Sequence, residues 1–292
     1  MSANRITLGQ PRLNADQVAE IVARFTPRDY DILSHLHEHR VLTTHQIEKI
    51  FFTLPQPTRR RMSVLLGLNA VARFRPWTPH GGSTPSHWVL GRAGAAVLAL
   101  RQDITVKELG YHPDTTLAIS MSSKLGHQLG VNDFFAQLHH HARRATSGAQ
   151  VKEWWSERRC AKLWGDLAKP DAYGRWAENG REIDFFLEHD TGSETRSKVA
   201  AKLTDYANLA DATGITTPLL LWLPSHTRES NLRQLISSSD LPVATAVHTS
   251  LSDGPAGAVW LPLGAEQPRL RLAELVNAWP HLIAPRNEAE MR

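Results

Sequence analysis

Three carboxylates and one lysine in the second half of the chain have the types and spacing of a site that hydrolyses phosphodiesters with a divalent metal. Asp171 lies at the start of one predicted strand, Glu188 and Asp190 end the next, and Lys202 falls in the helix predicted after it. Two or three hard oxygen ligands can hold Mg²⁺ or Mn²⁺, while a lysine stabilises charge or orients water. We therefore take Asp171 and Glu188 as candidate metal ligands and all four residues as candidate catalytic groups.

The same residues resemble the site of the PD-(D/E)xK nuclease superfamily. That pattern places a lysine two residues after Glu188, where this chain has Asp190. Some members of the superfamily carry the lysine on the following helix, which makes Lys202 the candidate substitute. Acidic strand ends are common in proteins, so the motif taken alone favours a structural role for these acids.

The elements that must position these residues alternate between strand and helix. In the strand predicted at 181–189, Ile183 and Phe185 face one way, whereas Asp184 and Glu188 face the other. Further strands are predicted at 151–159, 169–176, 218–223 and 241–248, with helices at 193–212 and 227–237. This alternation predicts an α/β sheet with helices on its faces.

Upstream, three short helices and a hairpin are predicted between residues 27 and 90. The first helix starts at Pro27 and ends near His39, the second starts at Thr43 with Gln46 completing a capping box, and the third starts at Thr58. Short strands at 71–75 and 87–90 enclose a turn-rich loop, and a small Ala-rich helix follows at 91–101. This order predicts a winged helix-turn-helix, whose third helix enters the major groove of DNA.

Charge supports the same interpretation. The stretch from Lys49 to Gln102 contains eight basic residues and no Asp or Glu, against a net charge of +4 for the whole chain. Because each carboxylate would repel a polyphosphate, we expect double-stranded DNA to bind here. The candidate DNA-binding residues are Arg59, Arg60, Arg61, Ser63, Arg73, Arg75 and His80. An Arg-rich solvated face, or a basic domain that binds another protein, is the alternative.

Length and composition set the remaining bounds. The 292 residues are 41% hydrophobic and 21% charged, which is ordinary for a globular chain of two domains. No apolar run approaches the roughly 20 residues that span a bilayer, and the first residues lack the apolar core of a secretory signal. We therefore expect a cytoplasmic protein without a membrane partner. The single cysteine, Cys160, cannot form an internal disulfide or a zinc site by itself.

The middle of the chain is predicted to be one long helix from Thr116 to about Arg144, with Gly126 and Gly130 as places where it could break. This helix contains three consecutive histidines at 139–141. Adjacent helical residues point in different directions, so these histidines cannot share one metal ion. We expect them at the surface.

Several segments together resemble the replication-relaxation family of plasmids and integrative elements. The resemblance runs from about Pro27 to Ile236, and its most specific parts are the segments GHQLGVNDF and EHDTGSET. It implies a winged-helix domain joined to a nuclease-like domain. The site residues that it implies are Asp171, Glu188, Asp190 and Lys202, with Asp133 as a further acid from a helix.

The chain is therefore predicted to be α/β (α+β overall), with a tail and short helix at 1–26, a winged-helix DNA-binding domain at 27–112 and a restriction-endonuclease-like α/β domain at 113–292. The function that follows is nicking or cleavage of plasmid or mobile-element DNA with Mg²⁺ or Mn²⁺, during replication or conjugative mobilisation. The rival, which Asp190 favours, is a non-catalytic replication or transfer accessory factor with a degenerate nuclease-like domain. A relaxase that attacks through Tyr173 or Tyr206 is a third class. Plasmid replication or transfer proteins are the expected protein partners, and a homodimer is left open.

Overall fold

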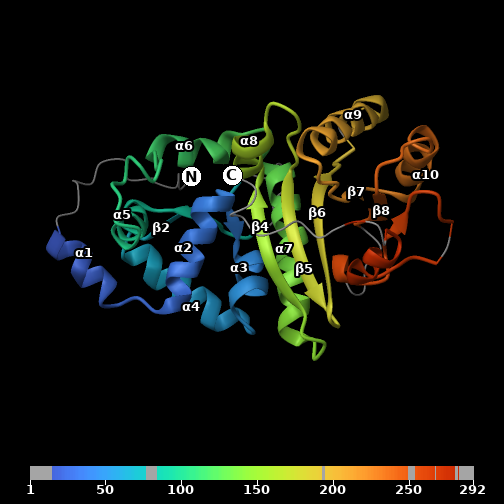
Figure 1. The fold of residues 1–292 in the computed structure, drawn as a ribbon. Coiled ribbons are helices and arrows are strands. Elements are labelled where there is room, and N and C mark those ends of the chain that lie inside the picture. Colours follow the sequence, from blue (N-terminus) through green and yellow to red (C-terminus); the bar gives the residue numbers. More distant parts are fainter. Residues whose placement is uncertain are drawn as a thin grey trace. The chain divides into compact units, whose positions relative to one another are not determined.

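Two structural units divide the chain, Met1–Asn132 and Asp133–Arg292. The computed structural model in Figure 1 describes residues 15–76, 84–192, 195–248, 254–266, 268–279 and 282. Each unit combines helices with a β-sheet, which confirms the predicted mixture of helix and strand. The boundary between the units lies inside helix α7 (Leu125–Arg144), so residues 113–132, which the sequence assigned to the second domain, group with the first unit.

The first unit begins with a helix, a short strand, two more helices and a hairpin. After α1 (Ala15–Val22), its elements are α2 (Pro27–His39), β1 (Leu42–Thr43), α3 (Thr44–Phe51), α4 (Pro55–Gly67), β2 (Val71–Phe74), β3 (His87–Leu90) and α5 (Arg92–Arg101). The strands form an antiparallel sheet in the order β1-β3-β2. Strand β1 was not predicted, because two residues are too few to show the alternation by which a strand is recognised.

Local sequence signals place the helix ends of this unit. Thr43 caps α3 through the predicted capping box: its hydroxyl accepts the Gln46 backbone N–H at 3.2 Å, and the Gln46 side chain accepts the Thr43 N–H at 2.9 Å. Helix α4 begins at Pro55, three residues before the predicted start at Thr58. Proline fits the first turn, where a backbone N–H has no helical acceptor. The arginines at 59–61 therefore lie in the second turn of α4.

Helix α5 packs directly on the hairpin. A Cβ atom added at Gly91 or Gly94 would collide with the backbone of Asn69 and Ala70. Glycine at these two positions thus permits the close approach of helix and strand.

The long helix predicted from Thr116 is instead interrupted before Leu125. Helix α6 (Pro113–Ala118) passes into the 3₁₀ turn η1 (Ile119–Met121), and α7 starts at Leu125 and continues through Gly126 and Gly130. The helix does not break at either glycine, the two places where the sequence left a break open, because one glycine in a helix costs only about 1 kcal/mol relative to alanine.

The second unit is built on a six-stranded mixed sheet in the order β4-β5-β6-β7-β8-β9. Its strands are β4 (Gln150–Ser156), β5 (Ala172–Glu178), β6 (Arg181–His189), β7 (Leu219–Leu223), β8 (Val243–Val247) and β9 (Leu261–Pro262). Neighbouring strands from β4 to β6 pair antiparallel, and those from β6 to β8 pair parallel. Strand β9 pairs antiparallel with β8. The helices are α8 (Glu157–Trp164), α9 (Arg196–Thr213) and α10 (His226–Leu235), with 3₁₀ turns η2 (Gly254–Ala256) and η3 (Leu272–Asn277).

Helices cover both faces of this sheet, as predicted for an α/β domain. On one face Phe134 of α7 makes ring contacts with Phe185 and Trp222. On the other face Phe186 contacts Trp164 of α8 and Tyr206 of α9. The predicted alternation of β6 is therefore confirmed, and Glu188 lies on the same face as Phe186, toward α9.

Candidate active site

Asp171 and Glu188 lie at one edge of the large sheet because β5 begins where its antiparallel neighbour β6 ends. Ala172 pairs with Leu187 in this register, which places Asp171 opposite the end of β6. The Asp171 carboxylate accepts the His189 backbone N–H at 2.8 Å. Glu188 is 4% exposed, so its carboxylate is held inside the protein beside Asp171.

Helix α9 supplies two further polar groups to Glu188. Lys202 Nζ donates to Glu188 Oε2 at 2.6 Å, and the Tyr206 hydroxyl donates to Glu188 Oε1 at 2.5 Å. Lys202 and Tyr206 are four residues apart and therefore share one face of α9. The sequence predicted the placement of Lys202, but it gave Tyr206 no role beside Glu188. The spacing of four residues from Lys202 was the signal that could have indicated it.

Burial and charge together shift the proton equilibrium of Glu188. Burial raises the pKa of the Glu188 carboxyl, the nearby charge of Asp171 raises it further, and Lys202 and Tyr206 offset only part of the effect, leaving a pKa of about 7. A carboxyl with this pKa is close to half protonated at neutral pH. Asp171 is thus near enough to disfavour the ionised form of Glu188.

This raised pKa predicts a pH dependence of folding stability. Without added metal, the free energy of unfolding of the wild type is expected to fall between about pH 4.5 and pH 7 relative to that of Glu188→Gln. The folded state keeps the Glu188 proton when the unfolded chain has already lost it, so rising pH favours unfolding across this window and not above it. Urea unfolding at several pH values measures the difference. If the free energy of unfolding changed with pH in the same way for the two proteins, the raised pKa of Glu188 would be contradicted.

The donor set of this cluster fits a divalent cation. Carboxylate oxygens are the ligands that Mg²⁺ and Mn²⁺ prefer, and a cation would offset the repulsion between Asp171 and Glu188. Within the described part of the chain, no group of three His, Cys, Asp or Glu residues is arranged to hold a metal. A cation at Asp171 and Glu188 would therefore draw its remaining ligands from water, backbone carbonyls or a phosphate.

Asp190 is engaged in a different set of contacts. One carboxylate oxygen accepts the Gly192 backbone N–H at 2.6 Å, and the other accepts Arg228 Nε at 2.6 Å. Arg228 comes from the first turn of α10, so this ion pair joins the end of β6 to a helix some 40 residues later. Both oxygens of Asp190 thus fix the turn after β6. Nothing in the sequence near Asp190 indicated Arg228 as its partner.

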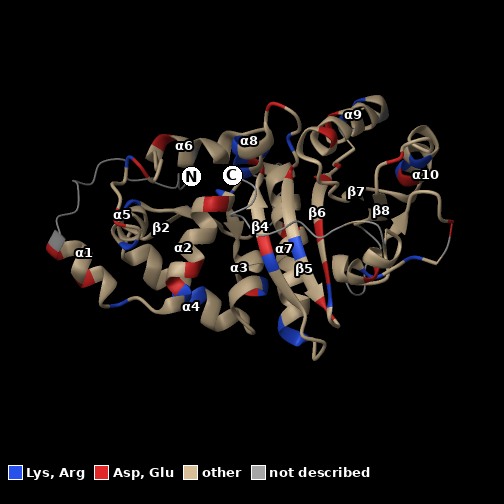
Figure 2. Cartoon of the chain, viewed as in Figure 1, with Lys and Arg blue, Asp and Glu red and all other residues tan. Residues whose placement is uncertain are grey.

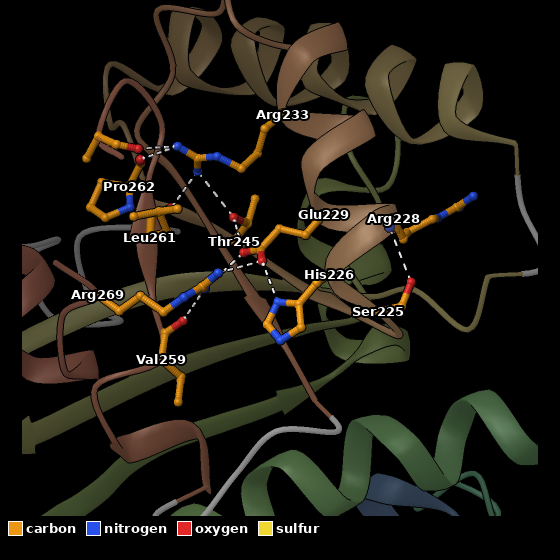
Figure 3. Close-up of polar contacts among 11 residues, drawn as sticks. Ser225, His226, Arg228, Glu229, Arg233, Thr245, Val259, Leu261, Pro262 and Arg269 are labelled. Atoms are coloured by element: carbon orange, nitrogen blue, oxygen red, sulfur yellow. Dashed lines mark hydrogen bonds and ion pairs between the residues drawn. The ribbon is translucent and has the colours of Figure 1, made fainter. Parts of the chain in front are cut away.

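The remainder of α10 is anchored by a buried polar network (Figure 3). Glu229 accepts Arg269 Nη2 at 2.6 Å and the Thr245 hydroxyl at 2.7 Å, and Arg233 donates to backbone carbonyls within 261–265. Burial acts to raise the pKa of Glu229, but the hydrogen bonds from Arg269 and Thr245 outweigh it and lower the pKa. These contacts hold α10, and with it Arg228, in place beside β8.

The two tyrosines near the acidic strands are hydrogen-bond donors rather than exposed nucleophiles. The Tyr173 hydroxyl donates to Asp184 at 2.9 Å, and Tyr206 donates to Glu188. Burial, followed by the charge of the partner carboxylate, raises the pKa of both phenols above the usual value. Attack by a phenolate requires a lowered pKa of the phenol, so these contacts disfavour the relaxase alternative.

Other sequence candidates in the second unit lie apart from Glu188. Asp133 accepts a hydrogen bond from Gln137 on α7, which packs on the opposite face of the sheet. Among the three histidines of α7, His140 is exposed and His141 Nε2 lies 2.8 Å from Glu178 Oε1. Cys160, on the inner face of α8, is fully buried in the core.

The basic candidates of the first unit fall into two groups. The exposed side chains on α4 are those of Arg59, Arg60 and Ser63. Figure 2 colours the basic positions of this helix. Arg61, in contrast, forms an ion pair with a buried carboxylate. Its Nε donates to Asp29 Oδ1 at 2.7 Å and its Nη2 to Asp29 Oδ2 at 2.5 Å. Burial acts to raise the pKa of Asp29, but hydrogen bonds from Arg61 and Thr26 outweigh it and lower the pKa.

The hairpin carries the remaining basic candidates. Arg73 and Arg75 are exposed on and just after β2. Arg73 lies over the Trp88 ring at 6.0 Å, and Arg75 Nε donates to Ser86 Oγ at 3.2 Å. His80 falls outside the described residues.

Comparison with known proteins identifies a family. Residues 33–219 match the family model described as replication-relaxation, which covers more than half of the chain and includes Asp171, Glu188, Asp190 and Lys202. No curated protein and no solved structure matches. Of the helices described, none has the length and apolar character needed to cross a bilayer.

Proposed function

This chain belongs to the replication-relaxation family, and we propose that it binds double-stranded DNA of a plasmid or mobile element and nicks or cleaves it with Mg²⁺ or Mn²⁺. The observation that carries the catalytic part is the contact of Lys202 with Glu188, beside Asp171, at one edge of the large sheet. A replication or mobilisation role agrees with the family.

The first unit supplies DNA binding. Its order of helix, strand, two helices and hairpin supports a winged helix, in which α4 would be the recognition helix. Arg59, Arg60 and Ser63 are exposed on α4, and Arg73 and Arg75 are exposed on the hairpin. Two adjacent elements thus present side chains suited to phosphates and to bases in the major groove.

Arg59 and Arg60 provide a direct test of this surface. The double substitution Arg59→Ala/Arg60→Ala is expected to weaken duplex DNA binding, and each lost phosphate contact should reduce the slope of log K against log salt by about one. Fluorescence anisotropy over a series of salt concentrations measures both effects. Lys107→Ala, an exposed substitution elsewhere in the same unit, should change neither. Unchanged affinity and slope in the double variant would contradict binding through α4.

The second unit supplies the chemistry in this proposal. Asp171 and Glu188 would hold the cation, which when bound activates water and neutralises negative charge on the phosphate. Lys202 lies within hydrogen-bonding distance of Glu188, so its ammonium group is close enough to stabilise the charge that develops on the phosphate oxygens. Tyr206 keeps the Glu188 carboxylate oriented from the side of α9. Water attacks phosphorus and loses a proton, the bond from phosphorus to one sugar oxygen breaks, and that oxygen takes up a proton to leave as a hydroxyl.

A non-catalytic accessory factor is the second candidate, and the position of Asp190 favours it. This residue stands where the nuclease pattern has a lysine, and both its oxygens are used to fix the turn after β6. In this alternative the second unit only binds DNA or a replication or transfer protein. Titration with Mn²⁺ distinguishes the two candidates. Tight binding of Mn²⁺ to the wild type that is lost in Glu188→Gln supports the nuclease. Absence of Mn²⁺ binding to the wild type supports the accessory factor.

A further inference from the structure

A shallow groove lies between α9 and the segment that follows α10. Its volume is about 560 Å³, and every residue that lines it belongs to the second unit. Its floor is a single face of α9 that includes Ala200, Ala207 and Ala210, and its wall is formed by residues 235–242. Neither Lys202 nor Tyr206 is among the residues that line the groove.

Small apolar residues of α9 form the floor of this groove, and Thr204, Thr216, Ser238 and Ser239 add hydroxyl groups to its lining. Ala200, Ala207 and Ala210 recur at helical spacing and leave room above the helix, while Leu203 and Ile236 close the bottom. Leu235 at the edge is 51% exposed. A floor of short side chains with an exposed leucine beside it is suited to the protruding apolar side chains of another helix.

The charges around the groove indicate the kind of partner. Exposed Asp211 and Asp240 line it, and no lysine or arginine is among its lining residues. Two exposed carboxylates in a lining without lysine or arginine would repel the phosphates of DNA and attract basic side chains. We propose that this groove binds an amphipathic helix of a partner protein, with an apolar face against α9 and Lys or Arg toward Asp211 and Asp240.

Two synthetic helical peptides test the proposal. They share a leucine face at i, i+3, i+4 and i+7 and differ only in carrying lysine or glutamate at the flanking positions. The lysine peptide is expected to bind the full-length protein at least about tenfold more tightly than the glutamate peptide. It should shift the amide NMR signals of α9 and residues 235–242. Asp211→Lys/Asp240→Lys should remove this preference, and Ala207→Trp should abolish binding by filling the floor.

Matched variants on the opposite side of α9 serve as controls. Asp205→Lys and Ala201→Trp are exposed, do not line the groove, and should bind the lysine peptide as the wild type does. Circular dichroism checks that each variant is folded, and the charge reversals change only exposed side chains. The proposal is overturned if the lysine peptide fails to bind, binds Ala207→Trp unchanged or shifts other amides. It is also overturned if duplex DNA shifts the same amide NMR signals of α9 and residues 235–242.

Discussion

Replacing Arg61 with alanine is expected to lower the free energy of unfolding by about 3–5 kcal/mol, the usual cost of removing one partner from a buried ion pair. Asp29 is fully buried, and both its oxygens accept hydrogen bonds from the Arg61 guanidinium. Without Arg61 a carboxylate would remain in the core with only Thr26 as a donor. Denaturant unfolding at pH 7 measures the loss.

The pH dependence of this effect has a definite sign. The folded pKa of Asp29 is lowered, so the stabilisation by Arg61 is fully present above the unfolded pKa of about 4 and is lost as the pH falls through the folded pKa. The difference between the wild type and Arg61→Ala should therefore shrink in acid. Arg59→Ala and Arg60→Ala, on the exposed face of the same helix, are the matched controls and should unfold like the wild type. An Arg61→Ala protein as stable as these controls would contradict the ion pair.

Glu188→Gln and Lys202→Ala are each expected to reduce nicking by about 10²–10³-fold while leaving duplex DNA affinity unchanged. Glutamine cannot supply the second anionic ligand, and alanine removes the ammonium group beside the phosphate. A plasmid-nicking assay and anisotropy on the same preparations measure the two properties separately. DNA binding is assigned to the first unit, so a parallel loss of affinity in either variant would contradict the proposed division of roles.

Two substitutions control for charge alone. Glu182→Gln removes a carboxylate from the same strand β6, at an exposed position far along the strand from Glu188, and Lys162→Ala removes an exposed lysine from α8. Neither should change nicking by more than a few fold. If they reduce it as strongly as the site variants do, the cluster around Glu188 has no special role.

Periodicity and capping chemistry made much of the fold predictable. The strand at 181–189, the capping box of Thr43 and Gln46, and the buried strand β7 were all correctly placed from short-range patterns. Strand β1 and the interruption before Leu125 were missed, because both depend on pairing and packing with segments distant in the sequence. Local patterns carry little information about such contacts.

The same limit applied to the roles of charged residues. Residue type and spacing placed Asp171, Glu188 and Lys202 together, since strand ends and the next helix meet at one edge of a sheet. They could not show that Arg61, unlike Arg59 and Arg60, is held in an ion pair, because its partner Asp29 lies 32 residues earlier. Nor could they pair Asp190 with Arg228, 38 residues later. Long-range ion pairs decide which charges remain available for function.

The most direct test of the proposed nuclease is incubation of the wild type with a supercoiled plasmid that carries its own gene and flanking DNA. The site at Asp171 and Glu188 predicts an open-circular or linear product in the presence of Mn²⁺ or Mg²⁺, and none when EDTA is added. A plasmid that the protein binds but leaves supercoiled with both metals would contradict the nuclease and leave the accessory factor.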